Sequence, residues 1–511
     1  MGYARIFSLG GCVLGMQVIE IEVHLVRGLP SFHVVGLPEK AVRESRDRVK
    51  SALLNAQFMF PRQKVVVGLA PAELPKEGSH LDLAIAIGLL VASKQVQVRR
   101  DLREYIWAGE LGLSGQVRPT GSSVSLAMAA QKLNHKLVLA SSVLLPQALQ
   151  KPPYVYGAGT IQEVANFLSA RDECELLKLN IRQEEINIEH KQVNLEDIYG
   201  NSMEKIAVLA AASGGHSLLL EGCPGVGKTM LAMASVGILP DLNQQSMLDV
   251  AQIYSLIGEI RLTKRPPFRA PHHMVTVNGL LGGGQVFQPG ELSLAHHGIL
   301  FLDELTEYKR ATLDHLREPL QSGQITISKS NYRKSIAAEC ILIAAMNPCP
   351  CGNYGILDEE CLCGYLDIQK YRARLSGPFL DRLDMRLKVT RHSRGHSPKL
   401  DWSMFLSSIK TTEIAKVMVK RARDKQMFRQ NKLNSVMGLQ EILNLKEHEE
   451  AVPAWVDQVR GQGAISFRGI GKTVALARTL ADCHGHDQIT IGHIKLAENM
   501  RASIASTQMR L

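Results

Sequence analysis

Long apolar runs are missing from this sequence of 511 residues. No segment reaches the ~18 uninterrupted apolar residues that a membrane-spanning helix needs, so we expect no membrane partner. The first residues, MGYARIFSLGGCVLGMQ, are broken by glycines where a secretory signal needs a continuous apolar stretch. Ile6 occupies the position at which a myristoylation signal has serine or threonine. We therefore expect a cytoplasmic protein whose nine cysteines are reduced unless they bind metal.

Strong compositional bias is absent as well. Hydrophobic residues make up 45% and charged residues 21% of the chain, which excludes collagen-like, repetitive and broadly disordered proteins. The chain is too long for one ordinary hydrophobic core, so two or three domains are expected. The net charge of +10 favours a polyanionic partner such as nucleic acid, but over this length it is a bias rather than a patch.

The pattern of apolar residues divides the chain into four parts. Residues 1–170 alternate short strand patterns with helical ones, which predicts an α/β domain. The charged segment 171–197 lacks strong periodicity and is predicted to be a linker. Residues 198–398 again combine buried strand-like runs with helical patterns, so a second α/β domain is predicted. The helical period continues through 399–511 without strand signals, which predicts a helical subdomain.

The strongest motif is a phosphate loop, GCPGVGKT, between the strand-like HSLLLEG and the helical KTMLAMASV. Its glycines allow backbone N–H groups to converge on phosphate oxygens, Lys228 reaches the β- and γ-phosphates, and Thr229 ligates Mg²⁺. We therefore expect ATP and Mg²⁺ as cofactors. The candidate nucleotide-binding residues are Gly222, Gly225, Val226, Gly227, Lys228, Thr229 and Met230.

Two more strand-like runs end in polar residues. The run GILFLDEL would bring Asp303 and Glu304 to the carboxyl end of a buried parallel strand, beside the phosphates. Asp303 is then predicted to ligate Mg²⁺ and Glu304 to orient the attacking water. The run ILIAAMN ends in Asn347, whose amide suits contact with the γ-phosphate or the water.

An arginine follows in GPFLDRLD. Arg382 lies beyond the strand that ends at Asn347, so it is suited to reach the γ-phosphate of a neighbouring subunit and stabilise transition-state charge there. Taken alone, Arg382 would more simply form a surface salt bridge.

The segment QITISKSNYRKSIAAEC predicts a β-hairpin, because apolar and polar residues alternate on both sides of a turn. Its tip carries Lys329, Arg333 and Lys334, which in a ring would line the pore and contact DNA phosphates without reading bases. A solvated charged hairpin is the alternative. A second candidate DNA element is the glycine-rich stretch 274–291.

These elements, in this order, resemble the AAA+ ATPases, in the branch of magnesium-chelatase subunits and MCM helicases. The stretches RPPFRAPHH, GLLGGGQVFQPGELSLAHHGILFLDEL, NPCPCG and LSGPFLDRLD narrow the resemblance to the ComM/YifB family, over essentially the whole chain. The resemblance implies a phosphate-loop ATPase core with a helical lid. It also implies that Asn347 is the first sensor, Arg382 the arginine finger, Arg468 the second sensor and Lys329 a pore lysine.

The same resemblance implies a function. It predicts a homo-hexameric, ATP-dependent DNA translocase or helicase that acts on single-stranded and branched DNA, including recombinase-coated DNA. Such a motor would promote branch migration in homologous recombination during natural transformation. The alternative is a chelatase-like motor that acts on a protein or on metal insertion.

The lid departs from the family pattern, because Lys472 and Ala475 replace expected arginines. The nearby string GIGKT is not expected to be a second phosphate loop, because Ser466 replaces its first glycine and no buried strand precedes it. The lid assignment therefore depends on Arg468 and Arg478.

The stretch PKEGSHLDLAIA suggests a hydrolytic centre, with Ser79 beside His80. This region resembles the Lon-protease fold, which is ribosomal S5 domain 2-like. In that alignment His80 occupies the nucleophile position and Val124 the position of the activating lysine, so no peptidase dyad is expected. Ser79 is expected to cap the helix that begins near Leu81. By resemblance to the similar domain of RadA, the domain is expected to contact DNA and stabilise the ring.

Four cysteines form the pattern C-x-C, nine residues, C-x-C: Cys349, Cys351, Cys361 and Cys363. In a reducing compartment, four thiols in two close pairs suit a tetrahedral Zn²⁺ site that would fix the loop after Asn347. Free thiols in a loop are the alternative. The pairs His272-His273 and His296-His297 are expected to point their imidazoles apart and to make polar contacts instead of binding metal.

Overall fold

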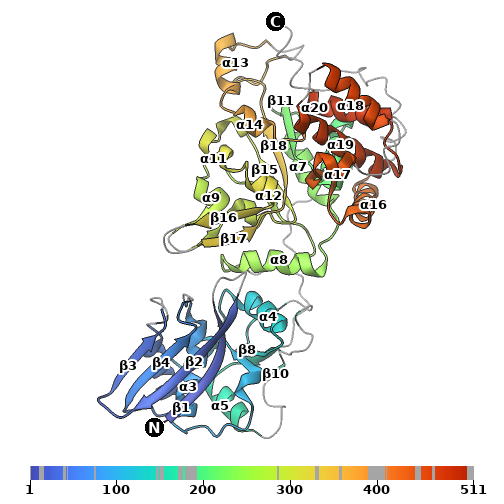
Figure 1. Ribbon diagram of the computed structural model, residues 1–511. Helices are drawn as coiled ribbons and strands as arrows, with labels where there is room; N and C mark the ends of the chain where they lie inside the picture. The colour runs from blue at the N-terminus through green and yellow to red at the C-terminus, as the bar shows by residue number, and fades with distance from the viewer. Residues whose placement is uncertain are drawn as a thin grey trace. The chain divides into compact units, whose positions relative to one another are not determined.

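The computed structural model describes most of the chain as two compact units. Unit 1 comprises Met1–Ile186 and Gln244–Thr263, and unit 2 comprises Asn187–Asn243 and Lys264–Leu511. Figure 1 shows the elements of each unit. The described residues are 2–10, 16–37, 42, 44–73, 76, 78–145, 149, 155–170, 177–178, 193–259, 261–284, 287–328, 333–355, 360–389, 409, 411–443, 451–462 and 466–502.

A four-stranded sheet forms one layer of unit 1, in the order β1–β2–β4–β3. Strands β2 and β4 alternate buried and more exposed residues, as expected for a sheet with one covered face. Helix α3, Asp82–Ala92, packs on β1 and β2 and is buried along almost its whole length, because it is apolar on all sides. The strands span Gly2–Gly10 (β1), Gln17–Val26 (β2), Ser31–Val35 (β3) and Lys64–Ala70 (β4).

A second sheet of unit 1 has the order β10–β9–β8–β5, and β6 and β7 form a separate hairpin. Helix α8, Gln244–Ser255, packs against α4, and its residues Leu248 and Ala251 join the core of unit 1. The sequence predicted one continuous domain over 198–398, whereas Gln244–Thr263 belongs to unit 1. The other elements are β5 Tyr105–Trp107, β6 Glu110–Leu111, β7 Val117–Arg118, β8 Lys136–Ala140, β9 Val155–Ala158, β10 Leu177–Lys178, α2 Ser45–Asn55, α4 Ser123–Lys132 and α5 Ile161–Ser169.

Unit 2 is built on a five-stranded parallel sheet in the order β12–β15–β18–β11–β19. Strands β11, β15 and β18 are buried at every residue, which explains why the sequence shows them as continuous apolar runs. The prediction of a mixed α/β fold with a parallel sheet is therefore confirmed. The strands span Leu218–Gly222 (β11), Phe268–Arg269 (β12), Ile299–Leu302 (β15), Ile341–Met346 (β18) and Met385–Val389 (β19).

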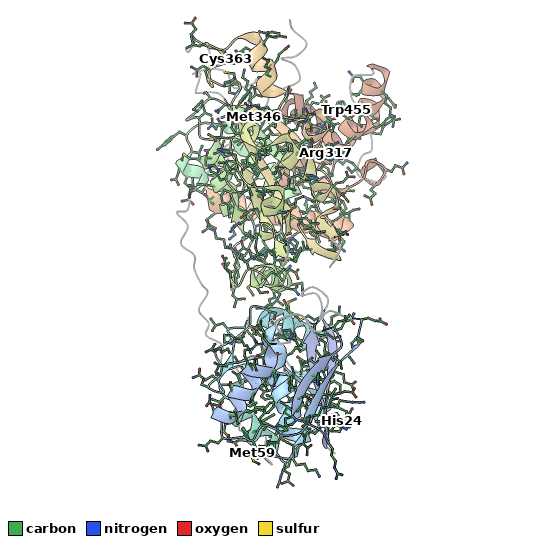
Figure 2. The ribbon with its side chains drawn as sticks, turned by 90° about the vertical axis from the view of Figure 1, so that its left-hand side faces the viewer. His24, Met59, Arg317, Met346, Cys363 and Trp455 are labelled. Atoms are coloured by element: carbon green, nitrogen blue, oxygen red, sulfur yellow. The ribbon has the colours of Figure 1, made fainter. Side chains whose placement is uncertain are left out.

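Helices surround this sheet and continue to the end of the described chain. From residue 411 onward, the described residues contain helices and no strand. Trp455 of α18, labelled in Figure 2, donates a hydrogen bond to Glu498 of α20 (3.0 Å). The longer helices are α6 Ser202–Gly214, α7 Lys228–Gly237, α13 Tyr365–Arg372, α16 Thr412–Gln430, α18 Ala451–Gln462, α19 Phe467–His484 and α20 Ile491–Ala502; short ones are α9 Val277–Leu281, α10 Glu291–Leu294, α11 Arg310–His315, α12 Pro319–Ser322, α14 Gly377–Leu380 and α17 Leu439–Leu443.

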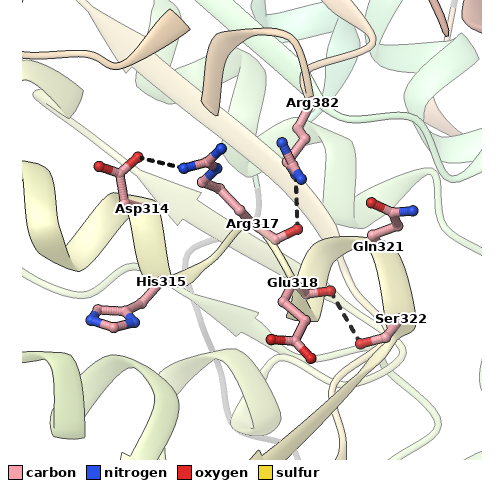
Figure 3. A pocket seen from close by; sticks show the side chains of 7 residues that line it. All are labelled: Asp314, His315, Arg317, Glu318, Gln321, Ser322 and Arg382. Atoms are coloured by element: carbon pink, nitrogen blue, oxygen red, sulfur yellow. Dashed lines mark hydrogen bonds and ion pairs between the residues drawn. The ribbon is translucent and has the colours of Figure 1, made fainter. Parts of the chain in front are cut away.

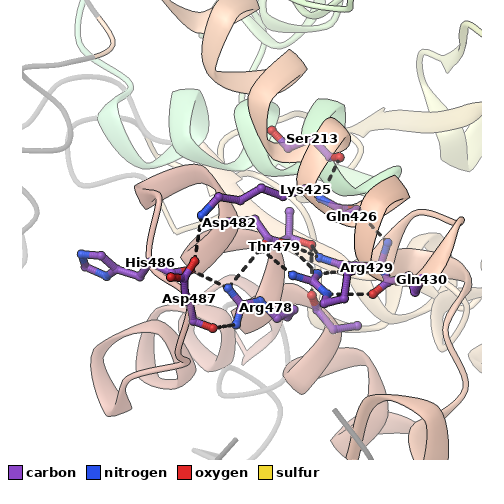
Figure 4. A network of polar contacts seen from close by, with 12 residues as sticks. Ser213, Lys425, Gln426, Arg429, Gln430, Arg478, Thr479, Asp482, His486 and Asp487 are labelled. Atoms are coloured by element: carbon purple, nitrogen blue, oxygen red, sulfur yellow. Dashed lines mark hydrogen bonds and ion pairs between the residues drawn. The ribbon is translucent and has the colours of Figure 1, made fainter. Parts of the chain in front are cut away.

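A buried ion network joins α16 to α19 (Figure 4). Asp482 is fully buried and accepts hydrogen bonds from both terminal nitrogens of Arg429 (2.9 and 3.0 Å) and from Arg478 (3.0 Å). Asn434 donates a further bond to Asp482 (2.9 Å). Because the carboxylate is satisfied on both oxygens, this network fixes the orientation of α19 against α16.

The predicted linker 171–197 lies mostly outside the described residues. No helix within the described part of the chain is both long and apolar enough to cross a membrane.

Candidate functional site

The phosphate loop connects β11 to α7 in unit 2. Gly225 and Gly227 have φ values of 80° and 91°, a left-handed conformation that favours glycine. A Cβ added at Gly225 would meet no atom within 4 Å, so the loop faces open space. Helix α7 begins at Lys228, and its first N–H groups have no partner within the helix. The predicted residues from Gly222 to Met230 therefore form a continuous connection from β11 into the first turn of α7, where backbone N–H groups are suited to an anion.

Lys228 joins the phosphate loop to the neighbouring strand β18. Its Nζ donates to the carbonyl oxygens of Gly222 (2.5 Å) and Cys223 (2.9 Å) and to Oδ1 of Asn347 (3.0 Å). Burial lowers the pKa of Lys228, and the carboxylate of Asp303 opposes that shift. The structure thus brings Lys228 and Asn347 together because parallel strands β11 and β18 end at the same edge.

Asp303 lies at the end of β15, beside the first turn of α7. The Thr229 hydroxyl donates to Oδ2 of Asp303 (3.1 Å), and the Glu304 N–H donates to Oδ1 (2.9 Å). Oxygen ligands of this kind are those that Mg²⁺ prefers, so Thr229 and Asp303 fit the ion that a phosphate loop uses. The backbone of Glu304 has a left-handed conformation, with φ of 49°, and the side chain is 58% exposed.

His273 is a neighbour of Glu304, and this contact is of the polar kind expected for the pair His272-His273. Its Nδ1 lies 3.2 Å from Oε2 of Glu304, and the Tyr308 hydroxyl fixes the same segment by donating to the Pro271 carbonyl (2.6 Å). Burial raises the pKa of Tyr308, which keeps its hydroxyl protonated as a donor. His273 lies in the stretch RPPFRAPHH, and nothing in that stretch indicates Glu304 as its partner.

The expectation that adjacent imidazoles point apart is wrong. The ring centroids are 4.0 Å apart for His272-His273 and 3.8 Å apart for His296-His297. The expectation assumed regular helices or strands, but both pairs lie outside them, and His297 has a left-handed φ of 59°.

Arg382 lies at the opposite end of β11 from the phosphate loop. Its carbonyl oxygen accepts a hydrogen bond from the hydroxyl of Ser217 (3.4 Å), the residue before β11, whereas Gly222 ends that strand. Five strand residues span about 16 Å, which is beyond the reach of an arginine side chain. Arg382 is instead oriented by the carbonyl oxygens of Arg317 (3.0 Å) and Pro378 (2.9 Å).

Arg382 lines a pocket of about 610 Å³ (Figure 3). Arg468, at the start of α19, donates to Gln321 on the pocket's rim (3.5 Å). Burial, followed by the charges of Arg468 and Arg317, lowers the pKa of Arg382. We call Arg317, Arg382 and Arg468 the arginine patch. The pocket is lined by Asp314, His315, Arg317, Glu318, Gln321, Ser322 and Arg382.

Lys472, which replaces an expected arginine, supports this patch. It donates to the Arg382 carbonyl, and its Nζ lies 2.8 Å from Oδ1 of Asp384. The string GIGKT lies inside α19, whose N-cap Ser466 accepts from the Gly469 N–H (3.1 Å). A helical segment cannot wrap a phosphate, so this string is not a second phosphate loop.

Known proteins match this chain along its length. Models described as magnesium chelatase subunit ChlI, subunit ChlI of Mg-chelatase, and subunit ChlI C-terminal match residues 194–397, 21–143 and 409–501. The competence protein ComM of Haemophilus influenzae is 37% identical over 99% of both chains. The YifB protein of Escherichia coli is 39% identical over 95% of this chain and 94% of its own.

The chain belongs to the ComM/YifB family. Its kinship with chelatase subunits is more distant. The magnesium-chelatase 67 kDa subunit of Chlorobaculum parvum is 26% identical over 35% of this chain and 27% of its own length. The resemblance inferred from the motifs is therefore confirmed.

In this ComM/YifB chain, the predicted β-hairpin is present as β16, Gln324–Ser328, paired antiparallel with β17, Arg333–Ala337. Lys329 lies outside the described residues. Arg333 and Lys334 begin β17, but their side chains lie outside the described part of the chain. The hairpin is confirmed as backbone, and its DNA contacts stay a prediction.

The suspected hydrolytic residues of unit 1 each have a separate partner. Ser79 donates to Glu110 and makes no cap hydrogen bond, so the expected helix cap is wrong. The buried His80 contacts the Leu9 carbonyl (2.7 Å), and burial lowers the pKa of His80. In the described contacts neither nitrogen of His80 is paired with a serine hydroxyl, so Ser79 and His80 do not form a hydrogen-bonded pair.

The carboxylate of Asp82 has partners other than Ser79 and His80. It is fully buried and accepts hydrogen bonds from the hydroxyl of Ser45 (2.5 Å) and from Nε of Arg48 (2.6 Å). Val124, at the position of an activating lysine, is buried in the core of unit 1. Unit 1 thus has no acid–base arrangement among these residues.

The structure gathers the four predicted cysteines. The Cys349 sulfur lies 3.3 Å from that of Cys351 and 3.7 Å from that of Cys361, and Cys351 and Cys361 are 3.6 Å apart. The ligand atoms of all four cysteines lie within 4.8 Å of one another. These separations are far longer than a disulfide bond of about 2.05 Å. They are close to the roughly 3.8 Å expected between thiolates around a tetrahedral Zn²⁺ with 2.3 Å bonds.

A second cluster, His484, His486 and His493, has similarly close ring nitrogens. The Thr490 N–H donates to Nδ1 of His493 (3.0 Å), so the neutral ring carries its proton on Nε2. That Nε2 lies 2.9 Å from Nδ1 of His484 and donates to it. A nitrogen that donates a proton has no lone pair for a metal, so the contact between His484 and His493 is described as a hydrogen bond between imidazoles.

Proposed function

We propose that this protein is an ATP hydrolase that couples turnover to movement along DNA. One observation carries the proposal: Lys228, Asp303 and Asn347 converge at the carboxyl end of the parallel sheet, while Arg382 lies at its other end. The first group can bind and cleave a nucleotide, and Arg382 is suited to serve the nucleotide of another subunit.

The residues at the carboxyl end have separate tasks. Lys228 neutralises the β- and γ-phosphates after exchanging its carbonyl partners for phosphate oxygens. Thr229 and Asp303 would hold Mg²⁺, which would supply positive charge to the phosphates. Glu304 orients the attacking water, and Asn347 contacts the γ-phosphate or that water.

The arginine patch completes the site of a neighbouring subunit. Arg382 and Arg468 would place positive charge on the γ-phosphate as the transition state forms. In the described part of the chain, the arginine patch is separated from the chain's own phosphate loop, so a ring would supply this charge from a neighbour, and the ComM/YifB relationship favours a homo-hexamer.

DNA is the proposed substrate of the motor. A relative of equal length is the competence protein ComM, and the net charge of this chain is +10. Lys329, Arg333 and Lys334 would contact DNA phosphates from the hairpin, and the Lon-like unit 1 would contact DNA and stabilise the ring. The proposed activity is cytoplasmic branch migration on single-stranded, branched or recombinase-coated DNA during recombination in natural transformation.

The four cysteines are proposed to bind a structural Zn²⁺. Their number, sulfur ligands and mutual distances suit tetrahedral coordination. The ion would fix the loop between β18 and α13, and it takes no part in hydrolysis.

ATP turnover with and without single-stranded and branched DNA tests the proposal, alongside displacement of a labelled strand. We expect DNA to stimulate turnover and the strand to be displaced, with both lost in Lys228→Ala. Turnover that is robust but indifferent to DNA would contradict the DNA motor. It would favour a chelatase-like motor that acts on a protein or metal-insertion client.

A further inference from the structure

The cysteine cluster is continuous with a nucleotide-binding residue. Asn347 follows β18 and accepts a hydrogen bond from Nζ of Lys228 (3.0 Å). Two residues later, the buried Cys349 begins the cluster, and its sulfur accepts from the Tyr354 N–H (3.3 Å). Whatever fixes Cys349 therefore also fixes the backbone that carries Asn347.

Gly352, the residue after Cys351, also packs directly on the phosphate loop. Gly352 is buried with φ of 88°, and a Cβ added there would lie 2.6 Å from Cδ of Pro224. Pro224 is part of the motif GCPGVGKT. Such close approach leaves no room for a side chain, so movement of Gly352 changes the support of the phosphate loop.

Arg372 makes a third link from the cluster to the phosphate loop. Its Nη2 lies 2.6 Å from Oε1 of Glu221, a buried residue of β11 one position before Gly222. Its Nε donates to the Pro348 carbonyl (3.3 Å), between Asn347 and Cys349. Arg372 ends α13, which begins two residues after Cys363. Both ends of the cysteine cluster are thus tied to β11.

We propose that Zn²⁺ bound by the four cysteines sets the affinity of the phosphate loop for ATP. The inference rests on the zinc assignment proposed above and adds to it a control of nucleotide binding. Bound zinc holds Asn347, Gly352 and Arg372 in the positions that support the loop before ATP arrives. Without zinc, this support must be ordered when ATP binds, which weakens binding.

Metal content tests the site itself. Protein purified under reducing conditions should carry about one zinc per chain by elemental analysis, as a four-thiolate site requires. The double variant Cys361→Ser/Cys363→Ser should carry almost none. Cys340→Ser is the matched control, since Cys340 is outside the cluster, and it should retain the metal. Equal zinc in both variants would overturn the site.

Nucleotide affinity tests the coupling, and it is measured without DNA so that failure of the DNA motor cannot mask the result. A fluorescent ATP analogue should bind about tenfold or more weakly after dialysis of the full-length protein against a strong zinc chelator. Added zinc should restore binding. Mercurial reagents are avoided, because Cys223 lies in the phosphate loop. Unchanged affinity in zinc-free, folded protein would overturn the inference.

Gly352→Ala separates the contact from the metal. The added methyl group collides with Pro224 but leaves the four thiols intact. The variant should therefore retain zinc and bind the analogue several-fold more weakly, with an unchanged far-ultraviolet circular dichroism spectrum. Full zinc with unaltered affinity would show that the cluster does not act through the phosphate loop. This test also stands if the cysteine double variant fails to fold.

Discussion

The two ends of the parallel sheet in unit 2 carry different sets of polar side chains. At the carboxyl end, Lys228 meets the amide oxygen of Asn347 (3.0 Å) and Thr229 meets the carboxylate of Asp303 (3.1 Å). At the amino end, Arg317 and Arg382 line an open pocket, and Arg382 donates hydrogen bonds to backbone carbonyls. The difference teaches that Arg382 is separated from the phosphate loop of its own chain by the length of β11.

Arg382→Ala should give the largest effect, because it removes transition-state charge without touching the phosphate loop. We expect ATP turnover to fall about 10³-fold or more while nucleotide affinity changes little. The measurements are steady-state hydrolysis and equilibrium binding of an ATP analogue. Arg421→Ala, which removes an exposed arginine of α16, is the control and should behave like the parent.

Mixing Arg382→Ala with Lys228→Ala protein sharpens the same comparison. If the two ends of the sheet serve different nucleotides, mixed rings contain some complete sites and recover part of the turnover. Loss of nucleotide binding in Arg382→Ala, or no recovery on mixing, would mean that the arginine acts within its own chain.

Glu304→Gln attacks the carboxyl end and should have the next largest effect. The amide keeps the size of the side chain but cannot accept a proton, so turnover should fall about 10²–10⁴-fold. ATP binding should be retained, as should binding of Mg²⁺ by Thr229 and Asp303. Retained hydrolysis would exclude Glu304 as the group that orients the water. In that case His273→Ala tests whether His273, whose Nδ1 lies 3.2 Å from Oε2 of Glu304, has this role.

Asp482→Ala should lower the free energy of unfolding by about 3–5 kcal/mol, because it leaves buried guanidinium groups without their counter-charge. Helix α19 carries Asp482 near its end and Arg468 near its start. Loss of the Asp482 carboxylate should therefore disturb the arginine patch more than the phosphate loop. Denaturant unfolding gives the magnitude. The control Asp487→Ala removes a 90% exposed carboxylate and should cost less than about 1 kcal/mol. Equal costs would contradict the role of burial.

Acid should have the smallest effect, again at the end of α19. Burial, followed by neighbouring imidazoles, lowers the pKa of His484 to about 4 and that of His493 to about 3. The unfolded chain takes up protons near its ordinary pKa of about 6.5, before the folded chain does. Stability should therefore be constant on this account above pH 6.5 and fall as the pH drops from 6.5 toward 4.

Thermal melting across this pH range measures the effect. His493→Gln should flatten part of the slope, because it removes one of the two titrating groups. A slope unchanged by this substitution would assign the acid sensitivity to other residues, such as the paired carboxylates.

The sequence predicted the elements that depend on neighbouring residues. Continuous apolar runs indicated the buried strands β15 and β18, and glycines followed by Lys228 indicated the turn into α7. The carboxyl-end cluster could also be predicted, because parallel strands must end at one edge. The closeness of the four cysteines could also be predicted, because only nine residues separate the two pairs.

Contacts between distant segments could not be predicted in this way. The pairing of His273 with Glu304 depends on how two separate loops approach each other. The position of Arg372 beside Glu221 depends on how the end of α13 packs beside β11. Ser79 was misassigned as a cap because its partner, Glu110, lies 31 residues away. The helix α8 likewise joins unit 1 through packing that its local pattern does not reveal.

By itself, then, the sequence determined a nucleotide-binding parallel sheet, because backbone conformation and burial of apolar runs are local properties. The tertiary structure decided that Arg382 is separated from the phosphate loop by the length of β11 and that the cysteine cluster rests on that loop. Both depend on distances through space, which are set by the packing of the whole sheet and are not encoded in the spacing of a motif.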